Sequence, residues 1–501
     1  MKRTFTFLLA LLLLLQTTAC ASGNPETPET DAPAAETGVT ASDETAAEET
    51  EAGLVKDDLP EDLDFDGETV TIHIRNGDQG NPEGNCIMEM TVEELNGEIL
   101  NDAIFNRNIA VNERLDVRIT PYVSYDWTGY HEALNEIRAS VNAGEDAYDI
   151  IAGWCNSELV SLAADGCFLD LAGAPYLDPE KPWWNQSLGS QNIFGGQKYF
   201  MTGEANILTS LGCAMGVFVN EKIASDYQLG NFADYVLEGT WTIDRMSEIT
   251  EMVFEDLNGN NTKDAADRVG SVLTDYLAAD AFYTSFDMHQ IKIDNDGNVA
   301  YEPDMERIHD AVKKINDLHW NNPGGLGGVS NTAFRKIFLE GRALMSIDFI
   351  EASREELRLM EDSYYIIPTP KFDEKQERYY TYFFNDMTVL SVPVTNLQAE
   401  AAYATMEALS SESYFHVTPV FFEDCMQSKY ARTEVTRQML ELIRETCYVD
   451  YEYVYGRLFN EPAFIFRNLV MSGSNDSASM IARNNKLVQK LIQRACDSFA
   501  D

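Results

Sequence analysis

The residues whose types and spacing best suit chemistry lie in one stretch, residues 256–267, which reads DLNGNNTKDAAD. Oxygen-bearing side chains stand at positions 1, 3, 5, 9 and 12 of this twelve-residue loop, and the residue at position 7 can offer its carbonyl. A hard cation such as Ca²⁺ needs about six to eight oxygen ligands on a short curved segment. We therefore predict a structural Ca²⁺ site with the ligands Asp256, Asn258, Asn260, Thr262, Asp264 and Asp267.

Two positions depart from the usual calcium loop. Asn261 replaces the glycine at position 6, although asparagine tolerates the left-handed backbone needed there. Asp267 replaces the bidentate glutamate at position 12. The alternative is a polar Asn-Gly turn that follows a helix and binds no metal. We expect no other cofactor.

Motifs for catalysis are missing from the sequence. There is no G-x-S-x-G, H-E-x-x-H or C-x-x-C pattern, and the six histidines show no ligand spacing. With 83 aspartates and glutamates, a glycosidase-like carboxylate pair can be chosen anywhere and carries no weight. We predict that the protein is not an enzyme. A surface glycoside-cleaving enzyme and a non-catalytic adhesin are the alternatives.

A charged start, an apolar run and a cysteine open the chain. The apolar run over residues 4–15 is too short to cross about 30 Å of hydrocarbon as a helix. Alanine followed by Cys20 resembles the lipobox of bacterial lipoproteins, although Thr17 stands where leucine is usual. We predict a signal peptide over residues 1–19, a lipid on Cys20 and a place on the outer face of the cytoplasmic membrane. The alternative is a secreted protein cleaved nearby.

An acidic tract follows the cysteine, and the chain as a whole is also negatively charged. Residues 20–65 are rich in Glu, Thr, Ala, Pro and Asp, so we predict a disordered tether. The formal net charge of the chain is −47. A field of this sign repels phosphate backbones, and we expect no nucleic-acid partner.

The eight cysteines are scattered, and their spacing proposes no disulfide framework. Cys155 and Cys213 stand in apolar surroundings and are expected to be buried thiols.

Hydrophobic patterns predict how the first half of the chain is built. They indicate strand, helix, strand, helix and strand over residues 68–75, 98–114, 116–123, 133–141 and 148–152. This alternation predicts a parallel sheet with helices packed on it. Ligands of such sheets bind at the carboxyl ends of the strands, which here carry residues 76–78 and 153–156.

Later segments follow the same kind of pattern. Strands are predicted over residues 198–204, 214–219, 343–347 and 364–370, and helices over 241–254, 304–320 and 398–410. Thr242 is the predicted N-cap of the first of these helices.

The order of several short segments carries a resemblance to a known family. After the leader come ETVTIHIR, YDIIAGW and DGCFLDL, then KYFMTGE, MGVFVNEKI and GTWTIDRM, and later FLEGRALMSID, YYIIPTPK and VLSVPVT. This order, across most of residues 66–501, resembles the extracellular solute-binding proteins of bacterial ABC importers. Within that group it resembles the carbohydrate-type class, which includes maltose-binding protein.

The resemblance implies a periplasmic-binding-protein-like fold, in which two α/β lobes joined by crossing strands close around a solute. The implied first lobe is residues 66–205 plus 343–383, and the second is 206–342 plus 384–501. The implied crossings lie near residues 204–206, 343–348 and 385–388. The implied partners are a mono- or oligosaccharide and the permease of an ABC transporter, and we expect a monomer.

Candidate ligand residues follow from the strand ends and the implied crossings. Sugars present hydroxyl groups and an apolar C–H face, which suit aromatic rings beside Asp, Glu and Asn side chains. Trp183 and Trp184 either line the cleft or fill the lobe, and we favour filling for one of them. The predicted ligand residues are Asn76, Asp78, Trp154, Asn156, Glu204, Asn206, Asp348, Phe349, Asn385 and Asp386.

Overall fold

The computed structural model describes a body that begins ten residues earlier than predicted. The described residues are 55–76, 85–125, 129–155, 159–189, 196–274, 276–294, 297–330, 333–384, 387–426, 434–474 and 476–499. Residues from Lys56 onward form one compact unit. The predicted tether end at residue 65 is therefore wrong, because Leu59 is buried and Asp57 pairs with Arg114 at 2.6 Å. The predicted signal peptide and Cys20 lie outside the described residues.

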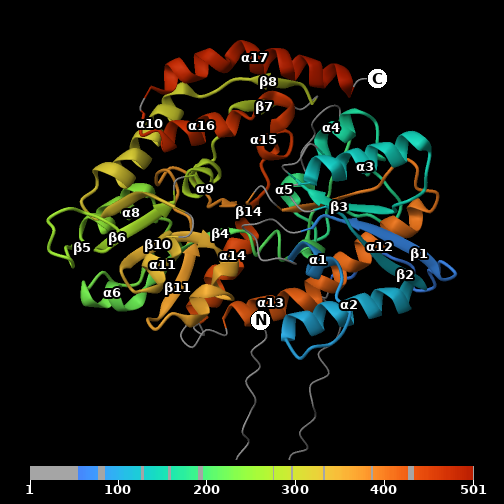
Figure 1. The fold of residues 1–501 in the computed structure, drawn as a ribbon, viewed down its shortest axis with the longest axis horizontal. Helices are drawn as coiled ribbons and strands as arrows, with labels where there is room; N and C mark the ends of the chain where they lie inside the picture. The colour runs from blue at the N-terminus through green and yellow to red at the C-terminus, as the bar shows by residue number, and fades with distance from the viewer. Residues whose placement is uncertain are drawn as a thin grey trace, which may run out of the picture. The chain divides into compact units, whose positions relative to one another are not determined.

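The first sheet is built as the hydrophobic pattern predicts. Its order is β13-β3-β1-β2, with β1 parallel to β2 and β3 and with β13 antiparallel to β3. Alternate residues of β1 face a core shared with α2 and α12, whereas α3 and α4 cover the other face (Figure 1). The bounds are β1 Glu68–Ile74, α2 Ile99–Leu115, β2 Val117–Val123, α3 Tyr130–Ala143, β3 Ile150–Trp154, α4 Leu159–Ala164, β13 Thr388–Ser391 and α12 Ala399–Glu412.

The second sheet has the order β11-β4-β10-β6-β5, and β9 also pairs with β6. Its strands are β4 Met215–Asn220, β5 Phe254–Glu255, β6 Arg268–Thr274, β9 Gly325–Val329, β10 Ala343–Phe349 and β11 Tyr364–Pro368. The helices packed around it are α6 Glu221–Asp226, α7 Phe232–Leu237, α8 Ile243–Glu251, α9 Leu277–Ser285, α10 Met305–Asn316, α11 Ala333–Leu339 and α14 Glu434–Thr446. Thr242 caps α8 as predicted, because its hydroxyl accepts the backbone N–H of Arg245 at 3.3 Å.

The chain passes between the two sheets three times among the described residues. It leaves the first sheet after Met201, returns to it before Thr388, and leaves again after η7, Ser413–Val417. We term the parts around the two sheets the first lobe, residues 56–206 and 388–417, and the second lobe, residues 215–384 and 418–499.

The lobe boundaries implied by the resemblance are wrong in the later half of the chain. Residues 343–383 were assigned to the first lobe, yet β10 pairs with β4 and β6, and β11 pairs with β4, in the second sheet. Residues 384–501 were assigned to the second lobe, yet β13 and α12 belong to the first. The crossing implied at residues 343–348 is therefore an inner strand of the second sheet.

Smaller elements complete the two lobes and join them. In the first lobe these are α1 Asn85–Met90, α5 Gln186–Gly189 and η3 Glu204–Asn206. The predicted strand at 198–204 forms only two isolated bridges, of Met201 to Leu390 and of Gly203 to Trp184. The second lobe adds β7 Ile291–Ile293, β8 Val299–Tyr301, η4 Asp317–Asn321, η5 Ile350–Ser353, η6 Glu356–Leu359, β12 Thr381–Tyr382, α13 Thr418–Cys425, β14 Cys447–Tyr448, α15 Tyr451–Val454, η8 Gly456–Phe459, α16 Pro462–Met471 and α17 Ser477–Ser498.

Helix α17, red in Figure 1, reaches from one lobe to the other. It packs on β8 and α10, and Phe499 just beyond its end contacts the ring of Tyr199 with centroids 5.7 Å apart. None of the helices in the described ranges is both long and apolar enough to span a bilayer. The seven described cysteines carry free thiols, and Cys155 and Cys213 are buried as predicted.

Candidate functional site

Two predicted ligand residues meet at the carboxyl edge of the first sheet. Asn76 follows β1 and Trp154 ends β3, and both line a cavity of about 40 Å³ with Arg75 and Tyr130. The strands are parallel, so their ends lie at the same edge. The indole of Trp154 meets Tyr130 edge to face, with ring centroids 5.7 Å apart. A space of this size holds about one water molecule and no sugar ring.

The other residues predicted at strand ends cannot be placed in the same way. Asp78 and Asn156 follow β1 and β3, and Asn385 and Asp386 precede β13. All four lie outside the described residues, so their part in the site stays a prediction.

A much larger cavity, of about 690 Å³, lies where the chain crosses between the lobes. The first lobe contributes the segment after residue 182 and the start of η3, and the second lobe contributes α13 and α14. Its wall combines aromatic surface with hydrogen-bonding side chains, among them Trp184, Asn185, Glu204, Tyr414, Thr418 and Arg444. Cavities of roughly 300–1,000 Å³ with this mixture are typical of small-molecule sites.

Glu204 joins the two lobes within this cavity. Its Oε1 accepts a hydrogen bond from Nε of Arg444 at 2.9 Å and lies 2.8 Å from Nη2 of the same guanidinium, and its Oε2 accepts the hydroxyl of Thr418. The guanidinium of Arg444 also lies over the ring of Tyr414, 4.6 Å from its centroid. Burial lowers the pKa of Arg444, but the carboxylate of Glu204 outweighs burial and raises it. A ligand here meets a fixed pair of opposite charges.

The paired tryptophans before the first crossing share one acceptor. The indole N–H groups of Trp183 and Trp184 donate to the two carboxylate oxygens of Glu407 at 2.9 Å and 2.8 Å. Trp183 is fully buried and Trp184 is 3 % exposed. Burial raises the pKa of the Glu407 carboxyl to about 7, although both indole hydrogen bonds lower it. Both rings fill the first lobe, and both also reach the wall of the large cavity.

Asn206 ends η3 in the interior, beside a buried polar group. It is fully buried, and its side-chain amide has no hydrogen-bond partner among the described residues. Thr209 donates its N–H and hydroxyl to the Glu89 carboxylate at 2.9 Å and 2.8 Å. Burial raises the pKa of the Glu89 carboxyl. Arg107 ties this group to η3, because it donates to the carbonyls of Glu89 at 2.7 Å and Ala205 at 3.5 Å.

The predicted pair at the end of β10 lies in the second lobe, away from the walls of the large cavity. Asp348 is 1 % exposed and receives two hydrogen bonds of 2.7 Å from Arg335. Arg335 also binds Glu356, and the pKa of its guanidinium is raised because these carboxylates outweigh burial. Phe349 packs against Phe384 with ring centroids 5.2 Å apart. The carboxylate of Asp348 is thus committed to an internal ion pair.

A second contact between the lobes has no signal in the sequence. Asn85 on α1 donates to the carboxylate of Glu351 on η5. Burial raises the pKa of the Glu351 carboxyl. Arg354 beside it donates to Asp424 on α13 at 2.6 Å. These partners lie 266 and 70 residues apart in the sequence, and neither pair forms a motif.

The predicted calcium ligands lie together in one loop between β5 and β6. Asp256 accepts the N–H groups of Gly259 at 2.7 Å and Asn261 at 2.8 Å. Asn261 has a φ of 58°, the left-handed backbone expected at this position. Asp267 is buried at the end of the loop, and its carboxylate accepts the N–H of Asp264 at 2.9 Å.

The middle of the loop is ordered by its own amides. Asn258 and Asn260 donate to the Asp264 carboxylate at 3.2 Å and 2.7 Å. The N–H of Thr262 donates to Asn260 Oδ1 at 2.6 Å. The oxygen donors stand on one curved segment, which fits the needs of Ca²⁺. Whether the loop binds the ion stays a prediction.

The described part of the chain resembles several solved structures in fold. The GacH receptor of Streptomyces glaucescens, solved unliganded and with acarbose, is 12% identical and matches over 85% of this chain and 99% of its own, with a TM-score of 0.52. An ABC transporter solute-binding protein of Thermotoga lettingae, bound to α-D-tagatose, is 13% identical over 85% of this chain and 100% of its own, also at 0.52. UspC of M. tuberculosis is 12% identical and matches over 84% of this chain and 100% of its own, with a TM-score of 0.52.

The chain has the periplasmic-binding-protein-like fold. At these identities the likeness shows the fold, so the two-lobed α/β architecture predicted from the sequence is confirmed. No family model and no curated protein sequence matches the chain. In the periplasmic-binding-protein-like fold of this chain, the cavity around Glu204 has walls from both lobes.

Proposed function

We propose that the protein captures a mono- or oligosaccharide outside the cell and delivers it to an ABC importer. The observation that carries this proposal is the cavity of about 690 Å³ around Glu204, at the crossings of a periplasmic-binding-protein-like fold. Aromatic rings beside charged and amide side chains suit the C–H faces and hydroxyl groups of a sugar. Receptors of the same fold bind acarbose and tagatose.

Hinge closure follows from the position of the cavity walls. Trp184 and Asn185 come from the first lobe, and Thr418 and Arg444 from the second. A solute that contacts both sets gains more contacts when the lobes close, so binding favours the closed form. In this proposal Asn76 and Trp154 belong to the first-lobe side of the closing cleft. Asn206 supports the first crossing, and Asp348 and Phe349 stabilise the second lobe.

The proposal includes a place and partners for the protein. A lipid on Cys20 and an acidic tether would hold the body at the outer face of the cytoplasmic membrane, where it meets the permease as a monomer. The net charge of −47 is unfavourable for nucleic acid and supports none as a partner. We propose a binding protein and not an enzyme, in keeping with a receptor and a solute-binding protein among its structural neighbours.

A thermal-shift panel of mono- and oligosaccharides tests the ligand class. We expect at least one sugar to raise the Tm and to shift small-angle X-ray scattering toward a more compact particle, because the ligand binds only the folded, closed form. Glu204→Gln should lower the affinity for that sugar at least tenfold, since a hydrogen bond to a charged group contributes about 1.5–3 kcal/mol.

The control is Glu423→Gln, which removes the same charge from an exposed position on α13. Its affinity should match that of the unmodified protein. Stabilisation by peptides and by no sugar would contradict the carbohydrate assignment, and release of sugar products would support a glycoside-cleaving enzyme instead.

A further inference from the structure

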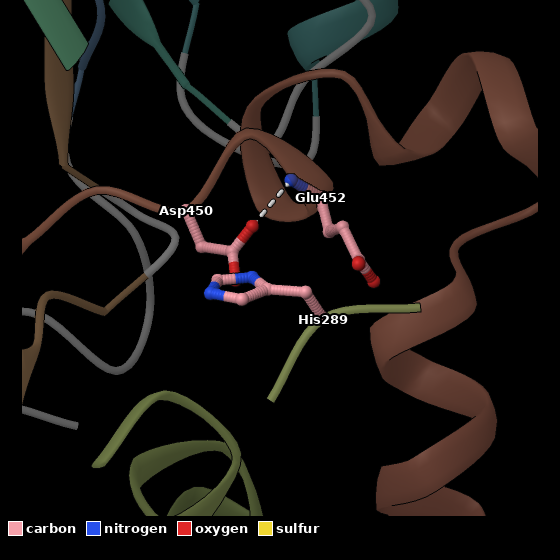
Figure 2. Close-up of side chains that lie close together, drawn as sticks. All are labelled: His289, Asp450 and Glu452. Atoms are coloured by element: carbon pink, nitrogen blue, oxygen red, sulfur yellow. Dashed lines mark hydrogen bonds and ion pairs between the residues drawn. The ribbon is translucent and has the colours of Figure 1, made fainter. Parts of the chain in front are cut away.

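A histidine and two carboxylates lie close together in the second lobe (Figure 2). None of the three lines the large cavity. His289 precedes β7, and Asp450 and Glu452 stand at the start of α15. One possible ligand atom from each lies within 4.8 Å of the other two. Nδ1 of His289 and Oδ2 of Asp450 are 3.2 Å apart. A four-coordinate Zn²⁺ with bonds of about 2.0–2.1 Å holds neighbouring ligand atoms roughly 3.3 Å apart, so small side-chain rotations complete the site.

Each of these three side chains is oriented by another group. Nε2 of His289 is 3.1 Å from the carboxylate of Asp287. When that nitrogen carries the proton, the lone pair of Nδ1 faces Asp450, an arrangement common to histidine ligands of metals. Oδ1 of Asp450 accepts the N–H of Glu452 at 2.7 Å and caps α15. The hydroxyl of Tyr283 donates to Glu452 at 2.8 Å.

The cluster brings two buried carboxyl groups together beside a single imidazole. Asp450 and Glu452 are 2 % and 1 % exposed. No lysine or arginine among the described residues forms an ion pair with either of them. Oδ2 of Asp450 and Nδ1 of His289 are buried and lack a well-directed hydrogen bond. Buried charges in proteins are paired or coordinate metals, and one divalent ion offsets both carboxylates at once.

We propose that His289, Asp450 and Glu452 bind one Zn²⁺ ion or a similar first-row divalent cation. One imidazole nitrogen and two carboxylate oxygens suit such ions, whereas the loop at residues 256–267 offers oxygen alone and suits Ca²⁺. The side chain of His289 is 20% exposed, so of the three ligands it lies nearest to solvent. The bound ion fastens α15 to β7, independently of the proposed solute site.

Calorimetric titration of Zn²⁺ into metal-free protein tests the site. Excess Ca²⁺ is kept in the buffer to occupy sites made of oxygen alone. We expect one equivalent of Zn²⁺ per chain and, with Co²⁺ as a probe, visible d–d absorption bands from nitrogen and oxygen ligands. Asp450→Asn keeps the oxygen that caps α15, and His289→Gln removes the nitrogen ligand. Each variant should bind Zn²⁺ at least tenfold more weakly and should lack the Co²⁺ absorption bands.

The matched control is His416→Gln, which removes an exposed imidazole 3.5 Å from the carboxylate of Glu412. Its Zn²⁺ affinity should be unchanged. Circular dichroism of each variant checks the fold, and His289→Gln decides the question if Asp450→Asn does not fold. No stoichiometric Zn²⁺ binding, or equal affinity in His289→Gln and the unmodified protein, would show that the cluster is an internal ion pair only.

Discussion

The paired tryptophans show what a single carboxylate can do at the residue scale. Trp183 and Trp184 are adjacent in the sequence, and Glu407 on α12 accepts hydrogen bonds from both of their indole N–H groups. Glu407 is itself buried, and these two hydrogen bonds occupy both of its carboxylate oxygens. The link fixes the segment that leads into the large cavity to the core of the first lobe.

The raised pKa of Glu407 predicts a pH-dependent stability. Burial raises its folded-state pKa to about 7, above the ordinary value of 4.5. The folded protein therefore holds the proton more tightly, and the stability that this group contributes is full below pH 4.5 and is lost as pH rises through 7. At about 1.36 kcal/mol per pKa unit, the loss is about 3 kcal/mol.

Urea unfolding of the protein and of Glu407→Gln from pH 4.5 to 8 measures this effect as a difference between two curves. We expect the variant to be less stable at pH 4.5, because one indole N–H loses its acceptor, and to fall less steeply with pH. Glu400→Gln, at an exposed position in the first turn of α12, should leave the slope unchanged. Parallel curves for the protein and Glu407→Gln would rule out the proposed titration.

Residue-scale contacts were the least predictable from the sequence. Glu407 lies 224 residues from Trp183, and no local pattern links them. The same holds for Glu204 and Arg444, which are 240 residues apart. Asn76 and Trp154 were predictable together, because each follows a strand and parallel strands end at one edge.

At the scale of elements, the loop between β5 and β6 gives the second prediction. Adding Ca²⁺ to metal-free protein should raise the Tm, since an ion that binds only the ordered loop stabilises the fold by mass action. Asp256→Ala should abolish that rise, because it removes the carboxylate at position 1. The measurement is differential scanning calorimetry with and without Ca²⁺.

The control for the calcium prediction comes from the β7–β8 turn. Asp294 there accepts the N–H of Asn298 at 2.9 Å, as Asp256 does within its own loop. Asp294→Ala should keep the Ca²⁺ response. If Ca²⁺ raises the Tm of Asp256→Ala as much as that of the unmodified protein, Ca²⁺ binds at another place in the chain.

Elements with a clear period were predicted well. Val70, Ile72 and Ile74 alternate and form β1, and the strand–helix alternation around them predicted a parallel sheet. The segment at 198–204 has strand-like composition, yet it makes only isolated bridges, at Met201 and Gly203. Composition gives the tendency to extend, while a partner strand decides whether a ladder forms.

At the scale of the whole molecule, the assignment of β10 shows the limit of a sequence. Its apolar residues fit either a crossing strand or the middle of a sheet. Its partners β4 and β6 are far away in the chain, and only their pairing decides the lobe. The order of segments identified the fold, but the lobe to which each later segment belongs depends on these long-range ladders.

The free thiols give a prediction for the folded body as a whole. A chain that starts at Lys56 should have an unchanged Tm in a strong reductant, because its seven cysteines form no cross-link. Titration with a thiol reagent in guanidinium should count seven thiols. A count of five or fewer, or a Tm that falls on reduction, would reveal a disulfide.

Helix α17 links the position of the C-terminus to the distance between the lobes. The helix packs on the second lobe, but Phe499 contacts Tyr199 in the first. Any separation of the lobes must break this aromatic contact or bend the last turn. The fluorescence of a dye attached beyond Phe499 should therefore report when the lobes separate. A bulky purification tag at the same end would push the lobes apart.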